Sequence, residues 1–124
     1  MDLSGNLKKV GKAFPYAMQG IGHAWKHEVN LRIHVSVAVI VILMGFWLSL
    51  SAMEWLIILL TIGGMLSLEL INTAVERVVD LVTREYHPLA KQAKDAAAGA
   101  VLVYAILSVI IGLVIFLPKL LKYI

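Results

Sequence analysis

Three long apolar runs constrain this chain more than any other feature. They extend from Ile33 to Leu50, from Trp55 to Leu68 and from Ala96 to Leu117. A helix needs about 20 largely apolar residues to cross a bilayer, and helices satisfy their own backbone polar groups in lipid. Hydrophobic residues make up 60% of the 124 residues, above the roughly half that is usual for soluble domains. We therefore expect a single all-α membrane domain with transmembrane helices over about residues 33–50, 55–82 and 94–118.

The segments between the runs are short or polar. Residues 3–30 alternate basic and apolar side chains, which predicts an amphipathic helix at the membrane surface, interrupted near Pro15. The sequence SAME, residues 51–54, is expected to link the first two spans, and residues 83–94 are expected to form a long polar loop. The chain has no cysteine, which excludes disulfides and thiolate metal sites. The first apolar run follows a long polar segment and has the length of a span, so we do not expect a secretory signal.

Positive charge predicts the orientation. Before the first span lie five basic residues, Lys8, Lys9, Lys12, Lys26 and Arg32. Around the second link lie Arg77, Arg84, Lys91 and Lys94, whereas after the third span lie two, Lys119 and Lys122. Because positive residues favour the cytoplasmic side, the N-terminus and the 83–94 loop are expected in the cytoplasm and the C-terminus outside the cell membrane. This asymmetry and attraction to anionic lipid explain the net charge of +3 without any nucleic acid.

Residues 69–80, ELINTAVERVVD, bring acid into the end of the second span. At about 100° per residue, Glu69, Asn72, Glu76 and Asp80 share one face of a helix. If the helix enters the bilayer near Glu54, a thickness of about 30 Å is crossed after roughly 20 residues. Glu69 then lies inside the boundary, and the other three lie progressively nearer water.

Carboxylates at graded depth suit a reaction between a lipid hydroxyl and a water-soluble substrate. A carboxylate within the membrane is costly and is usually retained for pairing or chemistry. Glu69 could act as general base on the hydroxyl, while Glu76 and Glu28 hold Mg²⁺ for phosphoryl transfer from ATP. Lys94 and Asp95 could supply a cation and a further acceptor. Alternatively, the acids pair structurally with Arg77, Arg84 or Lys94.

Other motifs give weaker indications of function. GNLKKVGKA, residues 5–13, has five residues between its glycines and no hydroxyl residue after Lys12, so it does not match a phosphate-binding loop. His23 and His27 have the spacing of zinc ligands but lack a third ligand on the same face. The tryptophans lie at predicted interfaces, although Trp25 shares its segment with Glu28 and is kept as a candidate lipid contact.

ELINTAVERVVD, followed by EYHPLAKQAKD and preceded by AWKHE at residues 24–28, resembles the signature of the prokaryotic diacylglycerol kinase family. The similarity extends over nearly the whole chain. It implies a membrane lipid kinase that is a homotrimer of three-span subunits, with sites between neighbouring chains. Small residues in the third span would permit the close helix approach that such an assembly requires: Ala93, Ala96, Ala97, Gly99 and Ala100.

The resemblance also implies roles for individual residues. Glu69 matches the catalytic base, and Glu28 and Glu76 match the residues that carry the divalent metal with ATP. Asn72 would brace the site. The remaining residues implied at the nucleotide are Tyr16, Glu85, Tyr86, His87, Lys94 and Asp95.

The lipid substrate divides the family. HPLAKQAKDAAAGAVLV and the ending IIGLVIFLPKL resemble the Gram-positive branch of undecaprenol kinases. The Gram-negative pattern has serine at the position of Ala98 and an acidic residue at that of His34. We therefore expect phosphorylation of undecaprenol for recycling of the cell-wall carrier, with Ala98, Trp25 and Glu69 near the lipid. The alternative is diacylglycerol, giving phosphatidic acid.

Two other classes of function fit a small membrane bundle. A proton-coupled transporter would place carboxylates within helices, but usually with repeats or helices broken at the midplane. Here the acids cluster at one interface, and Gly63–Gly64 is the candidate break. A non-catalytic assembly subunit would explain the small residues but not Asn72, Glu76 and Asp80.

Overall fold

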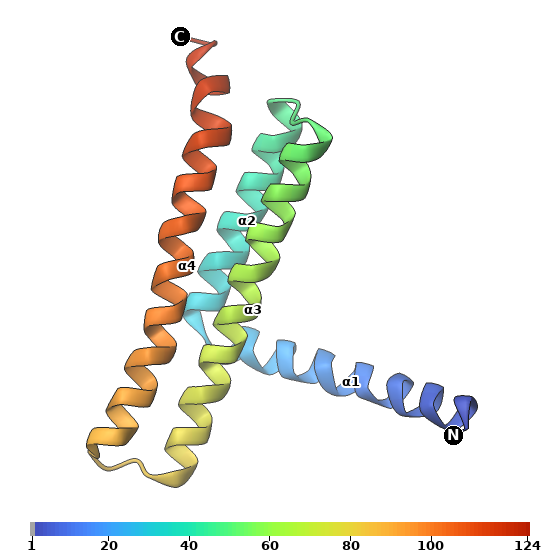
Figure 1. The fold of residues 1–124 in the computed structure, drawn as a ribbon, viewed down its shortest axis with the longest axis vertical. Helices are drawn as coiled ribbons and strands as arrows, with labels where there is room; N and C mark the ends of the chain where they lie inside the picture. The colour runs from blue at the N-terminus through green and yellow to red at the C-terminus, as the bar shows by residue number, and fades with distance from the viewer. Residues whose placement is uncertain (1) are drawn as a thin grey trace.

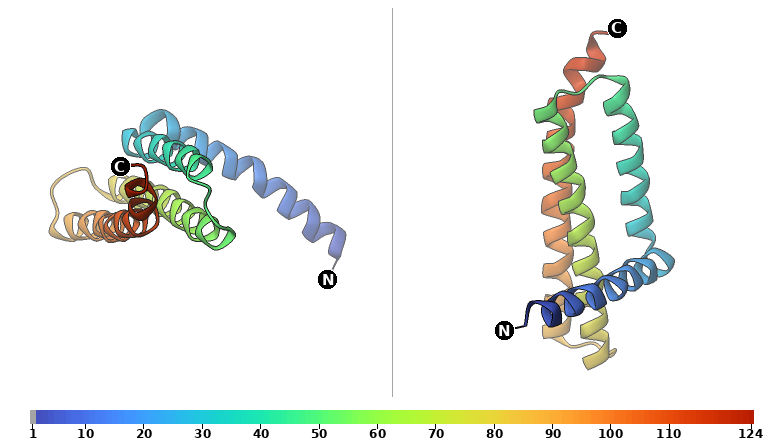
Figure 2. Two further views of the ribbon diagram at one scale, coloured as in Figure 1. Left: turned by 90° about the horizontal axis from the view of Figure 1, so that it is seen from above. Right: turned by 90° about the vertical axis from the view of Figure 1, so that its right-hand side faces the viewer.

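A computed structural model describes residues 2–124, which form four helices (Figure 1). They are α1 (Leu3–His27), α2 (Val29–Trp47), α3 (Ala52–Val82) and α4 (Pro88–Leu121). Helices α2, α3 and α4 lie side by side in a bundle, and α1 extends across and away from it (Figures 1 and 2). Each of the three bundle helices is long and apolar enough to cross a membrane. The expected all-α class with three candidate spans is confirmed.

The link between α2 and α3 is displaced from its expected position. Helix α2 ends at Trp47, and residues 52–54 already belong to α3, so the assignment of SAME as the link was wrong. The reason is a capping box: Ser51 Oγ accepts from the Glu54 amide at 3.2 Å, and Glu54 Oε1 accepts from the Ser51 amide at 3.0 Å. Ser49 has a φ of 55°, a left-handed conformation that helps the chain reverse direction.

The link between α3 and α4 is shorter than the polar sequence indicated. Helix α4 begins at Pro88, so the long loop expected over residues 83–94 was wrong for its second half. Proline suits the first helical turn because its missing N–H needs no partner there, and His87 Nδ1 accepts from the Leu89 amide at 3.1 Å. Lys94 and Asp95 are consequently presented from a helix.

Helix α1 continues through Pro15, so the expected interruption was wrong. Pro15 removes one backbone hydrogen bond, the one to the carbonyl of Gly11, while bonds on either side continue. Because this part of α1 is exposed, the carbonyl is open to hydration. Asp2 caps the start of the helix, and its carboxylate accepts from the Ser4 amide at 3.0 Å.

A sharp corner at Glu28 joins α1 to α2. Glu28 ends one helix and precedes the next in an extended conformation. Arg32 Nη1 donates to the carbonyls of Trp25 at 3.0 Å and Lys26 at 3.2 Å. A cation there satisfies free carbonyls and complements the negative end of the helix dipole. Helices α3 and α4 extend beyond the level of this corner (Figure 2).

Close packing between α3 and α4 depends on Gly64. A Cβ atom at this position would overlap the Tyr104 hydroxyl, which donates to the Leu60 carbonyl at 3.2 Å. Glycine here admits the aromatic ring rather than breaking the helix, and α3 continues through Gly63–Gly64. The midplane break that a transporter would use is therefore not present in α3.

Hydrophobic burial is concentrated near the α2–α3 link, where five buried residues form a cluster: Leu48, Leu50, Ile58, Ile115 and Phe116. Two ring contacts lie at the same end, Phe46 with Trp55 and Trp47 with Tyr123. We call this the aromatic end of the bundle and the opposite end, with the α1–α2 corner and the Thr83–His87 link, the polar end. Many large apolar side chains elsewhere are exposed, as expected for helices that face lipid.

Candidate functional site

Glu69 is the most deeply buried carboxylate among residues 2–124, with 2% of its surface exposed. It lies on α3 beside Asn72 and Thr73, which are also buried. The Thr73 hydroxyl donates to the Glu69 carbonyl at 3.1 Å, so this hydroxyl is engaged by the helix itself. The periodicity of the sequence placed Glu69 and Asn72 on one face of the helix, and the structure shows that both are buried.

His34 of α2 faces the Glu69 carboxylate. Its Nε2 lies 3.6 Å from Glu69 Oε2. Within residues 2–124, Glu69 forms no ion pair with Arg77, Arg84 or Lys94, the cations that a purely structural pairing would use. His34 was missed as a candidate site residue, although an ionisable side chain in an apolar run is itself a signal of function.

A polar cavity of about 620 Å³ lies at the polar end of the bundle. The α1–α2 corner, the last turns of α3 and the α3–α4 link contribute its lining residues: Glu28; Glu76, Arg77, Asp80 and Leu81; and Arg84. Arg77 Nη2 lies 3.7 Å from Glu28 Oε1. The two carboxylates predicted to hold metal thus share one cavity with two arginines that could face phosphate groups.

The donor set of this cavity fits magnesium bound together with a nucleotide. No cluster of three or more metal-ligating His, Cys, Asp or Glu side chains occurs in residues 2–124. Magnesium commonly needs only one or two protein carboxylates because phosphates and water complete its shell. Asn72 Oδ1 is buried and has no hydrogen-bond partner in the same part of the chain. An unsatisfied acceptor one turn from Glu76 is consistent with a bound cation or donor.

Two lysines near the cavity are already paired. Lys94 Nζ lies 2.6 Å from Asp80 Oδ1, which joins α4 to α3. Lys91 Nζ lies 2.5 Å from Asp95 Oδ2 along the first turns of α4. The alternative that the acids of α3 pair structurally with Arg77, Arg84 or Lys94 therefore applies to Asp80 but not to Glu69.

Several predicted site residues stay apart from the cavity and from Glu69. Tyr16 is 72% exposed on α1, and Tyr86 is 81% exposed in the α3–α4 link, where Glu85 and His87 are exposed too. Trp25 and Ala98 are also exposed, and neither lines a cavity described for residues 2–124. Within one chain, the structure does not bring these residues together with Glu28 and Glu76.

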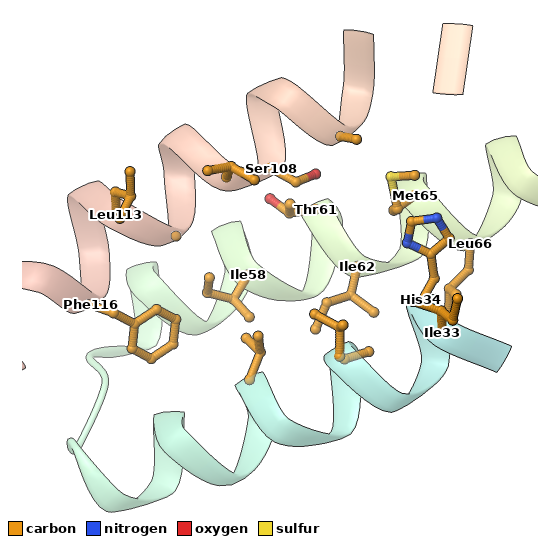
Figure 3. Close-up of a pocket in the computed structure, with 16 residues that line it drawn as sticks. Ile33, His34, Ile58, Thr61, Ile62, Met65, Leu66, Ser108, Leu113 and Phe116 are labelled. Carbon is orange, nitrogen blue, oxygen red and sulfur yellow. The ribbon is translucent and has the colours of Figure 1, made fainter. Parts of the chain in front are cut away.

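An apolar groove reaches His34, the residue that contacts Glu69. It has a volume of about 460 Å³ and lies between α2, α3 and α4 (Figure 3). Phe116 and Leu113 line it toward the aromatic end, and His34 and Met65 line it toward the polar end. A hydrocarbon chain in this groove would place a polar head near the His34–Glu69 pair.

The histidines of α1 lie in a positive environment. The rings of His23 and His27 are stacked with centroids 4.2 Å apart. The Arg77 guanidinium and then the neighbouring His27 lower the pKa of His23. This environment disfavours a further cation between the two rings.

Comparison with known proteins identifies the family. The family model described as prokaryotic diacylglycerol kinase matches residues 15–116. The chain belongs to this family. It is 54% identical over 119 residues to undecaprenol kinase of Bacillus subtilis, covering 96% of this chain and 97% of that protein. The predicted family is thereby confirmed, and the chain is a lipid kinase with helices that can span a membrane.

Two diacylglycerol kinases show how the similarity is distributed. That of Synechocystis is 47% identical over 111 residues, which cover 89% of this chain and 63% of the relative. That of Escherichia coli is 30% identical over 102 residues, which cover 82% and 84%. Identity to the Bacillus undecaprenol kinase is higher than to either, in agreement with the branch predicted from the sequence.

Proposed function

We propose that this kinase transfers the γ-phosphate of ATP to the hydroxyl of undecaprenol, giving undecaprenyl phosphate for recycling of the cell-wall carrier. The observation that carries this proposal is that the apolar groove reaches His34, 3.6 Å from the buried Glu69, while the polar cavity lies further along α3 toward the polar end. A long hydrocarbon chain and a charged nucleotide could then approach one carboxylate from different sides. The identity to the Bacillus undecaprenol kinase supports the choice of alcohol.

Glu69 is proposed as the general base. As the lipid oxygen attacks the γ-phosphorus, the bond from that phosphorus to the oxygen of the β-phosphate breaks and ADP leaves. The hydroxyl proton passes to the Glu69 carboxylate. Burial within the bundle excludes water that would otherwise compete as the nucleophile.

Glu28 and Glu76 are proposed to hold Mg²⁺, which would neutralise phosphate charge when bound with ATP. Arg77 and Arg84 line the same cavity and supply further positive charge. Lys94 is proposed to offset charge that develops during transfer. Its present partner Asp80 holds the ammonium near the cavity.

The predicted site residues that lie apart from Glu28 and Glu76 within one chain support a homotrimer. We propose that Tyr16, Glu85, Tyr86, His87 and Asp95 contact the nucleotide in a site completed by a neighbouring subunit, because one chain leaves them apart from Glu76. Ala98 and Trp25 are proposed to contact the lipid in the same way. Small residues on the first turns of α4 would allow the required close approach.

The arm formed by α1 is proposed to lie on the cytoplasmic surface of the plasma membrane. Its exposed apolar residues follow helical spacing: Leu3, Leu7, Phe14, Met18, Ile21 and Trp25. Lys8, Lys9 and Lys12 could contact anionic headgroups. This placement agrees with a cytoplasmic N-terminus and a C-terminus on the far side, as the distribution of basic residues predicts.

The proposed function is tested by substrate competition. The purified protein in mixed micelles would be given undecaprenol or diacylglycerol at equal mole fraction, with and without Mg²⁺, and lipid phosphate would be measured. We expect magnesium-dependent phosphorylation that strongly favours undecaprenol. A preference for diacylglycerol would retain the kinase mechanism but overturn the proposed substrate.

A further inference from the structure

The His34–Glu69 contact joins two features that are otherwise separate. His34 lines the apolar groove (Figure 3). Its Nε2 lies 3.6 Å from the carboxylate of Glu69. The Glu69 side chain is 3% exposed, whereas that of His34 is 27% exposed. The imidazole therefore lies between the open groove and the enclosed carboxylate.

The charges around Glu69 make this contact consequential. The titratable groups whose charges act on Glu69 are His34 from α2, Glu28 from the α1–α2 corner and Glu76 from α3 itself. Two of these three are acids, which oppose an ionised Glu69. A buried carboxylate requires an opposite charge or hydrogen bonds to remain ionised. Of the three, His34 alone can provide positive charge.

We propose that His34 is a positioning residue that holds the Glu69 carboxylate ionised and directed toward the end of the apolar groove. This assignment rests on the proposed function, in which Glu69 accepts the proton of the lipid hydroxyl. His34 itself neither gains nor loses a proton in the transfer. Its contribution is the direction and charge of the ion pair through Nε2.

The test compares His34→Gln with Ser36→Ala. Ser36 lies two residues further along α2, and its hydroxyl bonds its own helix, donating to the Arg32 carbonyl at 2.8 Å, so it is a matched control. Loss of His34 should lower kcat by about tenfold or more, in the range seen when an orienting partner is removed. KM for MgATP should not change, because the polar cavity retains its residues. Ser36→Ala should leave both parameters unchanged.

The pH dependence provides a readout that a merely structural role would not move. Without the imidazole, the charged groups that act on Glu69 are the acids Glu28 and Glu76, so the acid limb of the kcat profile should move to higher pH. His34→Lys restores a positive charge and should return the limb toward its original position. An unchanged kcat and pH profile in His34→Gln would overturn the assignment, as would parallel losses in kcat, MgATP affinity and thermal stability.

The same assay distinguishes a failure of the proposed role of His34 from a failure of the proposed lipid substrate. Wild-type protein and both His34 variants would be measured on undecaprenol and on diacylglycerol. Wild-type turnover with an unaffected His34→Gln variant would reject the role of His34 alone. Wild-type activity on diacylglycerol only would reject the proposed substrate while His34 is still tested on that lipid. Should His34→Gln fail to fold, His34→Lys would decide, since an acid limb displaced despite the retained charge would contradict the proposal.

Discussion

The two ends of the bundle solve opposite physical problems. At the aromatic end, polar groups are paired: Glu54 completes a capping box and also lies 3.2 Å from the Lys119 ammonium. At the polar end, Asn72 Oδ1 is buried without a partner in the described chain, and a cavity separates Glu28 from Glu76. Unsatisfied polar groups persist where a ligand can satisfy them. The aromatic end therefore stabilises the bundle, whereas the polar end has the unpaired polar groups that the proposed function requires for binding and chemistry.

Glu69→Gln, at the polar end, should have the largest effect on activity. The amide keeps the shape of the side chain but cannot accept a proton as a carboxylate does, so kcat should fall by roughly 10²–10⁴-fold. Nucleotide affinity should be largely retained. Phosphate transfer and equilibrium ATP binding would be measured on the same preparation, and an equal loss of assembly and activity would favour a structural role for Glu69.

Glu76→Gln should separate binding from chemistry at the polar end. Loss of one proposed metal ligand should weaken magnesium-dependent nucleotide binding by about 10- to 100-fold. Titrating ATP with and without Mg²⁺ measures this effect, and Asp2→Asn at the exposed start of α1 provides a carboxylate control, because asparagine can also cap the helix. Equal weakening in the absence of magnesium would argue against metal ligation by Glu76.

Gly64→Ala tests stability away from the site. The new methyl group would overlap the Tyr104 hydroxyl, so α3 and α4 must separate at a cost of about 1–3 kcal/mol. Thermal unfolding in micelles should show a lower midpoint, while the KM of the remaining folded protein is preserved. Gly63→Ala is the matched control because a Cβ there meets no atom within 4 Å in the described structure.

The smallest expected effect is a change in the titration of His23 in Arg77→Gln, measured without nucleotide because Arg77 also lines the polar cavity. Removing the guanidinium should raise the pKa of His23 toward its ordinary value, since Arg77 is the main cause of its lowering. A lowered pKa means that the unfolded chain binds this proton more readily, so the contribution of His23 disfavours folding as pH falls through the window between the two values. NMR titration of the imidazole would detect the change, and Lys122→Gln at the far end should not move it.

Features set by the geometry of a single helix could be predicted from the sequence. A contact between two helices, such as His34 with Glu69, could not. The periodicity of Glu69, Asn72 and Glu76 follows from helical geometry, and the apolar runs follow from the thickness of the bilayer. His34 reaches Glu69 only through the packing of α2 on α3, which no spacing within one helix reveals. The starts of α3 and α4 were misplaced for a simpler reason. Their caps, Ser51 and His87, lie within the segments that were predicted to be links.

The position of Glu28 also joins the arm to the polar cavity, because the residue lies at the α1–α2 corner and lines that cavity. This residue occupies the corner that ends α1, with its amide bonded to the Ala24 carbonyl at 2.8 Å and the corner clamped by Arg32. A tilt of α1 therefore carries the Glu28 carboxylate with it, whereas Glu76 follows α3. If the arm lies on the membrane surface as proposed, a change in the depth or curvature of that surface would alter the spacing of the two acids.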